Sequence, residues 1–369
     1  MDKKLNILIC PLEWGLGHAA RMIPVARKLK EMGHNVIIGS GQKHSALFQS
    51  EIEGLSYVSF TGFKPGYSRH LPQYLSLLFK IPLLLFHIIS EHFRLKALVK
   101  EHSIDLVISD NRFGLWNRKI TSVYITHMPL IPFPKRFRFL EHIGIALHRQ
   151  VIRKYSLCFI PDLPGEINFS GRLSHGVKLS GNVRYIGILS RFIGLEPSTT
   201  ENPFKFPHNT VVLSGPEPQR EIFRQKLITL LRDIKPQTIM FEGNPDKKGE
   251  PGLIGNIICY SHLNGSLMKE VIESSDNIIT RSGYTAIMEL MSLNCSALII
   301  PTPGQTEQEY LAEYLSHKGY FKTISQNELI EGISFCSDKC ITAGEVNSES
   351  ILLLNEALRE MLEIHHKED

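Results

Sequence analysis

Residues 280–289 of this 369-residue chain read TRSGYTAIME, and they form the sharpest motif of the sequence. A short apolar run ends here, small residues turn the chain at Ser282 and Gly283, and a helical pattern follows. Free backbone N–H groups at a helix N-terminus suit a diphosphate, to which Ser282 can add a hydroxyl donor. Glu289 lies about two turns into this helix, where its carboxylate can accept both hydroxyls of a ribose. Ordinary helix capping with a solvated glutamate explains the same residues equally well.

A second polar helix start follows the next apolar run, at residues 301–310, PTPGQTEQEY. A Pro/Gly loop opens the helix and presents amides and carboxylates at Gln305, Glu307, Gln308 and Glu309. Such groups can hydrogen-bond sugar hydroxyls in pairs. The alternative is a polar first turn, in which glutamate favours the helix dipole.

The same alternation of apolar runs and helical spacing extends through the whole chain and predicts parallel α/β structure. In the N-terminal half the expected strands are 5–10, 36–39, 57–60, 105–109, 122–126 and 157–160. In the C-terminal half they are 211–214, 238–241, 257–260, 277–280 and 297–300. Helices are expected between them, among others at 217–232, 264–274, 284–292 and 307–318.

The break in this rhythm at 181–207, which is rich in Gly and Pro, predicts a connection between two Rossmann-like domains. We expect an N-terminal acceptor domain over 1–185 and a C-terminal donor domain over 186–345. A helix and tail over 346–369 should pack back on the first domain. Because ligands favour the carboxyl ends of parallel strands, the central cleft between the domains is the expected site.

The stretch from Thr280 to Tyr310 resembles the donor-binding motif of MurG-like GT-B glycosyltransferases. The shared pattern is an Arg-Ser-Gly turn, a helix glutamate, a strand ending in proline and a Gln/Glu helix start. The resemblance implies a GT-B fold and an inverting transfer from a UDP-sugar, with UDP-N-acetylglucosamine the first donor to consider. It implies that Glu289 binds the ribose and that Gln308 and Glu309 bind the sugar. The family normally has Gln at the position of Glu309, so this residue leaves the sugar open.

The resemblance extends to the turn at Ser214 and Gly215, which would approach the donor diphosphate. Pro216 and Pro218 remove N–H donors beside it. The loop at 259–263 would hold the base of the nucleotide. The expected donor-binding residues are Ser214, Gly215, Arg281, Ser282, Gly283, Glu289, Gln305, Glu307, Gln308 and Glu309.

The candidate base lies in the other half of the chain, where residues 11–18 read PLEWGLGH. The MurG-like family has a glycine-rich loop ending in His at this place. His18 can take the proton of an acceptor hydroxyl, and Gly15 and Gly17 would lie against the acceptor. The alternative is a capping or core-edge histidine.

Two further strand ends carry polar candidates. Asp110 is a second candidate for the base, and His127 is expected to bind the acceptor. The family also has a His at the second strand end, followed there by Glu and here by Met128. A buried histidine with satisfied hydrogen bonds is the alternative for His127.

The composition indicates an ordinary globular protein, with 43% hydrophobic and 21% charged residues. A net charge of +4 is too small to predict nucleic-acid binding. Six scattered cysteines favour free thiols, and the N-terminus lacks a signal-peptide core, so a cytoplasmic protein is expected.

The segment Leu75–Ile89 is the most apolar of the chain, but Lys80, Pro82 and His87 interrupt it. It falls short of the roughly 20 apolar residues of a membrane span, which predicts a buried or interfacial helix. A peripheral contact with the inner face of a membrane would bring it to a lipid-linked acceptor; a partly buried helix with solvated lysines is the alternative. The accompanying basic residues are Lys80, Arg94, Lys96, Lys135, Arg136 and Arg138.

These features favour a glycosyltransferase that moves a sugar from a nucleotide-sugar to a hydroxyl of a glycan or lipid-linked, cell-envelope acceptor. The chain has no Asp-x-Asp metal motif, and neither metal nor cofactor is expected. A UDP-N-acetylglucosamine 2-epimerase shares the double-Rossmann plan but needs further catalytic carboxylates. A non-catalytic nucleotide-sugar-binding protein would bind the donor without turnover.

Overall fold

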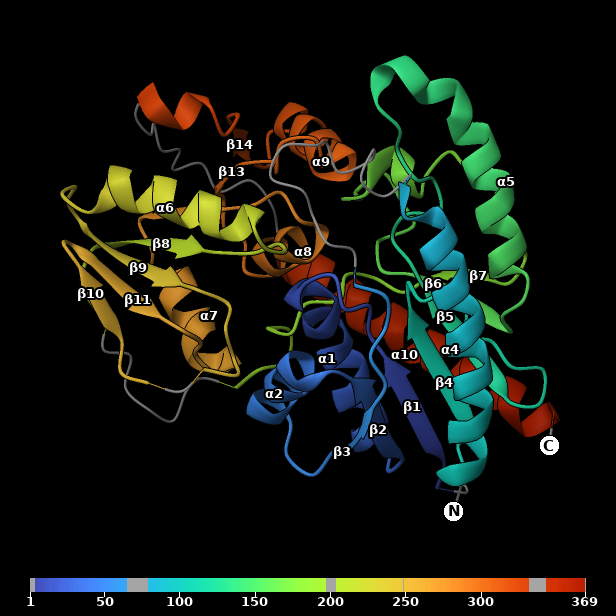
Figure 1. The fold of residues 1–369 in the computed structure, drawn as a ribbon. Coiled ribbons are helices and arrows are strands. Elements are labelled where there is room, and N and C mark those ends of the chain that lie inside the picture. The colour runs from blue at the N-terminus through green and yellow to red at the C-terminus, as the bar shows by residue number, and fades with distance from the viewer. Residues whose placement is uncertain (1–3, 65–78, 197–203, 248, 332–342, 369) are drawn as a thin grey trace.

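The computed structural model describes residues 4–64, 79–196, 204–247, 249–331 and 343–368. Figure 1 shows two α/β domains, each built on a sheet with helices on both faces. This architecture confirms the predicted pair of Rossmann-like domains.

The N-terminal sheet is parallel throughout, with the strand order β3-β2-β1-β4-β5-β6-β7. Its strands are β1 (Asn6–Cys10), β2 (Asn35–Ser40), β3 (Ser56–Ser59), β4 (Leu106–Asp110), β5 (Thr121–Ile125), β6 (Leu157–Ile160) and β7 (Val183–Tyr185). Its helices are α1 (Leu16–Glu31), α2 (Gln42–Glu51), α4 (Ile81–Glu101) and α5 (Glu141–Ile152), with 3-10 turns η1 (Lys135–Leu140) and η2 (Gly171–Leu173).

The C-terminal sheet has the order β10-β11-β9-β8-β12-β13-β14, in which only the β10–β11 pair is antiparallel. Its strands are β8 (His208–Val212), β9 (Gln237–Phe241), β10 (Gly252–Ile254), β11 (Ile257–Tyr260), β12 (Asn277–Thr280), β13 (Leu298–Ile299) and β14 (Lys322–Thr323). Its helices are α6 (Gln219–Leu231), α7 (Gly265–Glu273), α8 (Tyr284–Ser292) and α9 (Thr306–His317), with the 3-10 turn η3 (Glu328–Glu331).

The last helix, α10 (Ala343–Glu368), crosses from the second domain to the first (Figure 1). It packs against α8 and β5, and its Glu360 pairs with Arg184 at 2.7 Å. The helix therefore returns to the first domain, as expected.

One continuous core joins the two domains. Buried residues of α8 and α9, such as Ile287 and Leu311, belong to the same cluster as buried residues of α1 and β1. Apolar burial is the main stabilising term of a fold, so this shared core keeps the carboxyl ends of the two sheets facing each other.

Helix α4 contains most of the apolar segment 75–89, of which residues 75–78 lie outside the described part. It exposes large apolar side chains, with Leu83, Phe86 and Ile89 49%, 66% and 58% exposed. The segment is therefore not a buried helix. Among the residues that the structure describes, no helix combines the length and apolarity needed to cross a bilayer.

Candidate active site at the domain interface

Side-chain contacts of Glu13 and Trp14 fix the shape of the loop between β1 and α1. The Glu13 carboxylate accepts the backbone N–H of Gly41 and lies 3.3 Å from the Lys64 ammonium. The Trp14 indole N–H donates to the carbonyl of Phe63 at 2.9 Å. The loop is thus tied to the neighbouring ends of β2 and β3, and α1 starts at a fixed position.

His18 lies in the first turn of α1, and its Nδ1 is 2.8 Å from Oδ2 of Asp110. Asp110 ends β4 and is fully buried, whereas the His18 side chain is 20% exposed. With the Asp110 carboxylate as its acceptor, Nδ1 of His18 carries the proton and Nε2 holds the free lone pair; Nη2 of Arg21, 2.9 Å from the same Nδ1, then makes a charge contact and not a hydrogen bond. The structure therefore joins the two base candidates into one hydrogen-bonded pair.

Burial lowers the pKa of His18, and the neighbouring Arg21 lowers it further against the opposing effect of Asp110. Burial also opposes ionisation of Asp110, but Arg21 and His18 outweigh it and lower the pKa of this carboxyl. The pair is consequently held as a neutral imidazole beside a carboxylate, which is the state that a general base requires.

His127 follows β5 and is 3% exposed. Its Nδ1 accepts from Nη1 of Arg21 at 3.1 Å, so its Nε2 carries the proton and donates to Oε1 of Glu307 at 2.9 Å. Its ring stacks on Tyr284, with centroids 4.3 Å apart and planes at 5°. The predicted acceptor residue thus contacts the donor domain from two sides.

Burial opposes ionisation of Glu307, but His127 outweighs it and lowers the pKa of this carboxyl. Glu307 lies in the first turn of α9, and its carboxylate reaches the first domain. A carboxylate of the C-terminal domain is therefore connected through His127 and Arg21 to the His18–Asp110 pair.

The N-terminus of α8 meets the first turn of α1 directly. The Thr285 hydroxyl donates to the carbonyl of Gly17 at 3.0 Å, and a Cβ on Gly17 would lie 3.1 Å from that hydroxyl oxygen. Gly15, the other predicted acceptor position, caps α1 with open space around it. A larger residue at position 17 would push the donor helix away.

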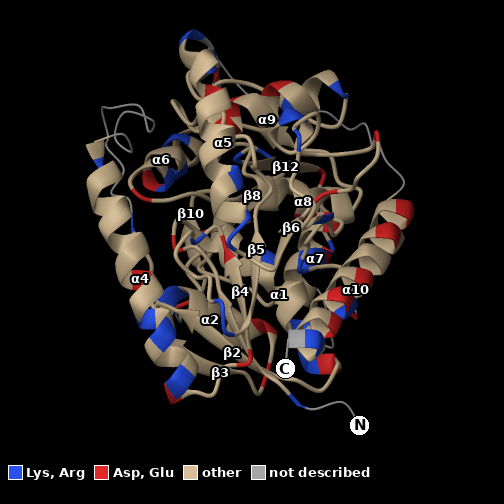
Figure 2. Cartoon of the chain, turned by 90° about the vertical axis from the view of Figure 1, so that its right-hand side faces the viewer, with Lys and Arg blue, Asp and Glu red and all other residues tan. Residues whose placement is uncertain are grey.

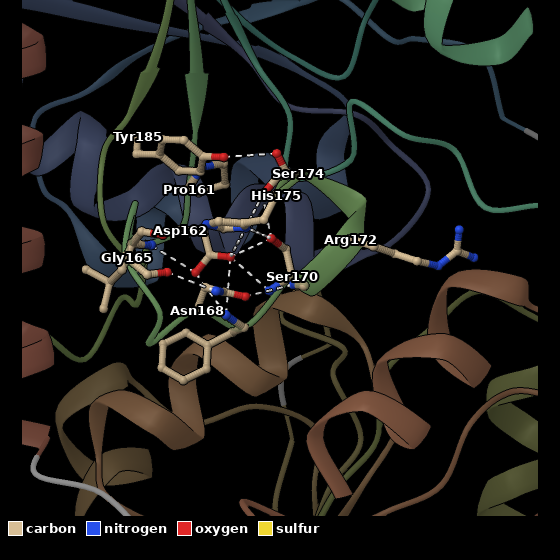
Figure 3. A network of polar contacts seen from close by, with 12 residues as sticks. Pro161, Asp162, Gly165, Asn168, Ser170, Arg172, Ser174, His175 and Tyr185 are labelled. Carbon is tan, nitrogen blue, oxygen red and sulfur yellow. Dashed lines mark hydrogen bonds and ion pairs between the residues drawn. The ribbon is translucent and has the colours of Figure 1, made fainter. Parts of the chain in front are cut away.

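The loop after β6 forms a further part of the contact with the C-terminal domain. Figure 3 shows it closed on itself around the buried Asp162, which accepts the backbone N–H of Ser170 at 2.8 Å. The loop receives the Tyr284 hydroxyl at the Pro161 carbonyl, at 2.8 Å, and the Tyr314 hydroxyl at Oδ1 of Asn168, at 2.9 Å. Its network gives α8 and α9 a rigid surface to pack on.

Glu289, the predicted ribose ligand, is 8% exposed on α8. Arg191 of the interdomain connection donates to its Oε1 at 2.8 Å and lies 3.4 Å from Oε1 of Glu51. Burial raises the pKa of Glu289 against the pull of this guanidinium. Arg191 thus links the donor helix, the connection and α2, and fixes the orientation of the Glu289 carboxylate.

Two side chains of the turn before α8 face the interior of the domain. Arg281 is fully buried and donates to Oε1 of Gln326 at 2.6 Å and to the carbonyl of Pro301 at 3.1 Å. The Ser282 hydroxyl donates to the carbonyl of Gln308 at 2.9 Å. These groups are engaged within the domain and shape the turn, while Gly283 caps α8 and no side chain hydrogen-bonds to the N–H groups at the helix start.

The α9 residues point in different directions. Gln305 is the N-cap, and the buried Gln308 accepts the backbone N–H of Thr302 at 2.8 Å. Glu309 is exposed and accepts the N–H of Gly304 at 2.8 Å. Glu309 therefore caps its own helix in this structure, and Glu307 is the carboxylate that faces the first domain.

The turn after β8 contains Ser214, whose buried hydroxyl has no hydrogen-bond partner in the described part of the chain. Gly215 follows with φ of 95°, a left-handed conformation that favours glycine. Beside the turn lies a charged cavity of about 270 Å³ at the ends of β8 and β9. It is lined by Leu213, Glu217, Arg220, Glu221, Arg224, Glu242, Asn244 and Lys247.

Similarity to known proteins identifies the kind of enzyme to which the second domain belongs. Residues 243–350 match the glycosyltransferase family 28 C-terminal domain. An uncharacterized glycosyltransferase of Methanosarcina acetivorans is 25% identical over 350 residues, covering 90% of this chain and 88% of that protein.

A shorter similarity concerns an enzyme with a defined substrate. Over 129 residues the chain is 28% identical to the UDP-N-acetylglucosamine–N-acetylmuramyl-(pentapeptide) pyrophosphoryl-undecaprenol N-acetylglucosamine transferase of Buchnera aphidicola. The match covers 33% of this chain and 36% of that enzyme. It agrees with the MurG-like resemblance of the donor motif.

Solved structures share the fold over the whole length. The glycosyltransferase SnogD from Streptomyces nogalater superposes with a TM-score of 0.58 at 14% identity, covering 100% of both chains. The spinosyn rhamnosyltransferase SpnG complexed with thymidine diphosphate gives 0.58 at 12% identity, covering 97% of this chain and 100% of that one. These similarities show the GT-B fold, and the sequence matches favour a transferase over the epimerase alternative.

Proposed function

We propose that this chain, a glycosyltransferase by its C-terminal domain and its relatives, transfers a sugar from a UDP-sugar to a hydroxyl of a lipid-linked glycan. The observation that carries the proposal is the His18–Asp110 pair at the interface with the N-terminus of α8. The base thereby lies on one domain and the anion-binding end of a helix on the other. A displacement at an anomeric carbon needs this arrangement, because the acceptor attacks from one side and the diphosphate leaves from the other.

His18 takes the proton of the acceptor hydroxyl at Nε2 as the hydroxyl attacks the anomeric carbon. Asp110 accepts the Nδ1 proton at 2.8 Å and stabilises the imidazolium that forms. The bond from the anomeric carbon to the diphosphate breaks on the opposite face, so the transfer inverts the configuration. The N–H groups at the start of α8 receive the departing diphosphate charge.

The donor is held on the C-terminal domain. Glu289 accepts the ribose hydroxyls, and Arg191 fixes its carboxylate. The unpaired hydroxyl of Ser214 adds a donor to the diphosphate. Glu307 and Gln308 at the start of α9 read the sugar hydroxyls. No step of this scheme calls on a metal ion or a further cofactor.

The pH dependence of turnover follows from the charge state of His18. A base works in its neutral form, so activity is lost as pH falls through the pKa of His18, which burial lowers below its ordinary value of 6.5. We expect kcat at saturating donor and acceptor to stay constant from pH 8 to pH 6.5 and to fall only below that range. A decline that begins above pH 7 would contradict the assignment.

A donor screen tests the proposed substrate class. Thermal shift against UDP-, GDP-, TDP- and CMP-sugars should give stabilisation by UDP-sugars alone, because a ligand of the folded state raises its apparent stability. Transfer from the best donor to a polyprenyl-diphosphate-linked sugar should release UDP. Stabilisation without any UDP release across lipid-linked and soluble acceptors would support the non-catalytic alternative instead.

The acceptor class is inferred from an apolar face on the first domain. Helices α4 and α5 lie on its outer side (Figure 1), and the N-terminal half of α4 carries no charge while Lys and Arg gather toward its end (Figure 2). This face has the composition of an interfacial membrane contact. Its exposed apolar residues are Phe79, Ile81, Leu83, Leu85, Phe86, Ile89, Phe93, Phe139, Ile143 and Leu147.

Vesicle binding tests this face. The double substitution Phe86→Ser and Phe139→Ser removes two side chains that are 66% and 68% exposed. It should weaken sedimentation with phosphatidylglycerol vesicles about 100- to 10,000-fold, since burying each of the two side chains contributes about 1.5–3 kcal/mol. Leu253→Ser, at a 70% exposed residue of the other domain, is the control and should bind normally. Equal binding of all three proteins would rule out the contact.

A further inference from the structure

Arg21 is a buried cation at the centre of the site, and neither the base nor the donor assignments give it a task. Its side chain is 2% exposed. Nε donates to Oδ1 of Asp110 at 3.1 Å, and Nη2 donates to the same oxygen. Nη1 donates to Nδ1 of His127 at 3.1 Å. A buried guanidinium is costly unless its donors are used in this way.

The position of Arg21 affects both members of the catalytic pair. Its Nη2 lies 2.9 Å from Nδ1 of His18, the nitrogen that donates to Asp110. The positive charge therefore opposes protonation of His18 while it favours the ionised form of Asp110. Lysine would supply the charge but not the planar set of donors that reaches two partners at once.

Arg21 also reaches the donor domain through one intermediate. His127 accepts from Arg21 at Nδ1 and donates from Nε2 to Glu307 on α9. The contacts thus run from Glu307 through His127 and Arg21 to Asp110, and from there to His18. Every member is held by side-chain hydrogen bonds of 3.1 Å or less.

We propose that Arg21 is a positioning residue of the transfer reaction, which orients Asp110 and His18 and joins them through His127 to Glu307 of the donor domain. The proposal rests on the proposed function, because it requires His18 as the base. In this arrangement His18 is oriented for catalysis when the two domains are in contact. Their separation would take Glu307 away from His127, so that the ring that accepts from Arg21 would lose its hydrogen bond to α9.

The charge state of His18 in the full-length protein gives the first test. The ¹³Cε1–H signal of His18, assigned by its loss in His18→Gln, can be titrated by NMR without any substrate. In Arg21→Gln its midpoint should move to higher pH, because the positive charge is gone and the charge of Asp110 acts alone. An unchanged or lower midpoint would overturn the proposal.

Two variants separate this effect from damage to the fold. Arg21→Lys keeps the charge, so the midpoint should return toward that of the native protein, and it also serves if Arg21→Gln does not fold. Arg112→Lys alters another buried arginine of the same domain, which pairs with Glu91 at 3.0 Å and not with the catalytic pair. The His18 midpoint should not move in this control; a shift equal to that of Arg21→Gln would mark a general effect of buried arginines.

Turnover tests the connection to the donor domain, with UDP release from UDP-N-acetylglucosamine as the measurement. Arg21→Gln should lower the rate about 100-fold and Glu307→Gln about tenfold, and the double variant should be no slower than Arg21→Gln, because the effects of residues in one hydrogen-bond network do not add. Thr285→Val removes an interface contact that is not part of the chain of contacts from Glu307 through His127 to Arg21. Its fold-loss in rate should therefore multiply with that of Arg21→Gln. If the fold-losses of Arg21→Gln and Glu307→Gln also multiply in the double variant, the proposed connection between these two residues is overturned. Native UDP release by His18→Gln would instead refute the base, and with it the proposed function.

Discussion

Substitution of His18 by alanine is expected to lower kcat about 1000-fold and to leave the affinity for UDP within about twofold. General bases contribute about 10²–10⁴-fold to enzymatic rates, and His18 has its Nε2 free beside the anion-binding end of α8. The side chain is 20% exposed and does not belong to the core, so the fold should survive. Steady-state turnover and calorimetry with UDP on the same protein provide the measurement.

Two further variants are compared with His18→Ala, one at its hydrogen-bond partner and one as a control. Asp110→Asn keeps the shape of the anchor but offers Nδ1 a less suitable partner, so kcat should fall in the same direction as in His18→Ala. His102→Ala, at a half-exposed histidine after α4, should turn over like the native protein. Native kcat in His18→Ala would remove this residue from the mechanism.

Glu289→Gln is expected to weaken UDP binding about 10- to 100-fold, which is the second large effect. The substitution removes the charge that accepts the ribose hydroxyls, and hydrogen bonds to charged groups contribute about 1.5–3 kcal/mol each. Glutamine is preferred to alanine here because it fills the same volume and still offers Arg191 an acceptor.

The control for Glu289 is Glu349→Gln, at an exposed glutamate on α10, which should bind UDP normally. Calorimetry of both variants and the native protein at one pH separates lost affinity from lost protein. Unchanged affinity in Glu289→Gln would exclude the ribose contact and leave α8 with a purely structural glutamate.

The main strands of the fold could be predicted because they are continuous apolar runs buried on both faces. The runs expected at 157–160, 257–260 and 277–280 have the observed bounds. The edge strands β7, β10 and β14 were not predicted, since each has two or three residues and is partly exposed. Such short strands have too few residues to show a period.

The candidate site could be predicted at strand and helix ends, but the direction of each side chain could not. The Arg-Ser-Gly turn has the same letters whether Arg281 faces the donor or, as observed, the carbonyls inside its domain. The position of Arg21 beside His18 could have been predicted from the sequence, because Arg21 follows His18 by three residues on one helix face. Arg191 was not, since its partner Glu289 lies 98 residues away.

A structure of the protein with bound UDP would locate the donor site directly. We expect the ribose hydroxyls at the Glu289 carboxylate and the diphosphate at the N-terminus of α8. The terminal phosphate should then face His18 across the domain interface. UDP bound in the charged cavity beside Arg220, Arg224 and Lys247, with Glu289 untouched, would contradict this expectation.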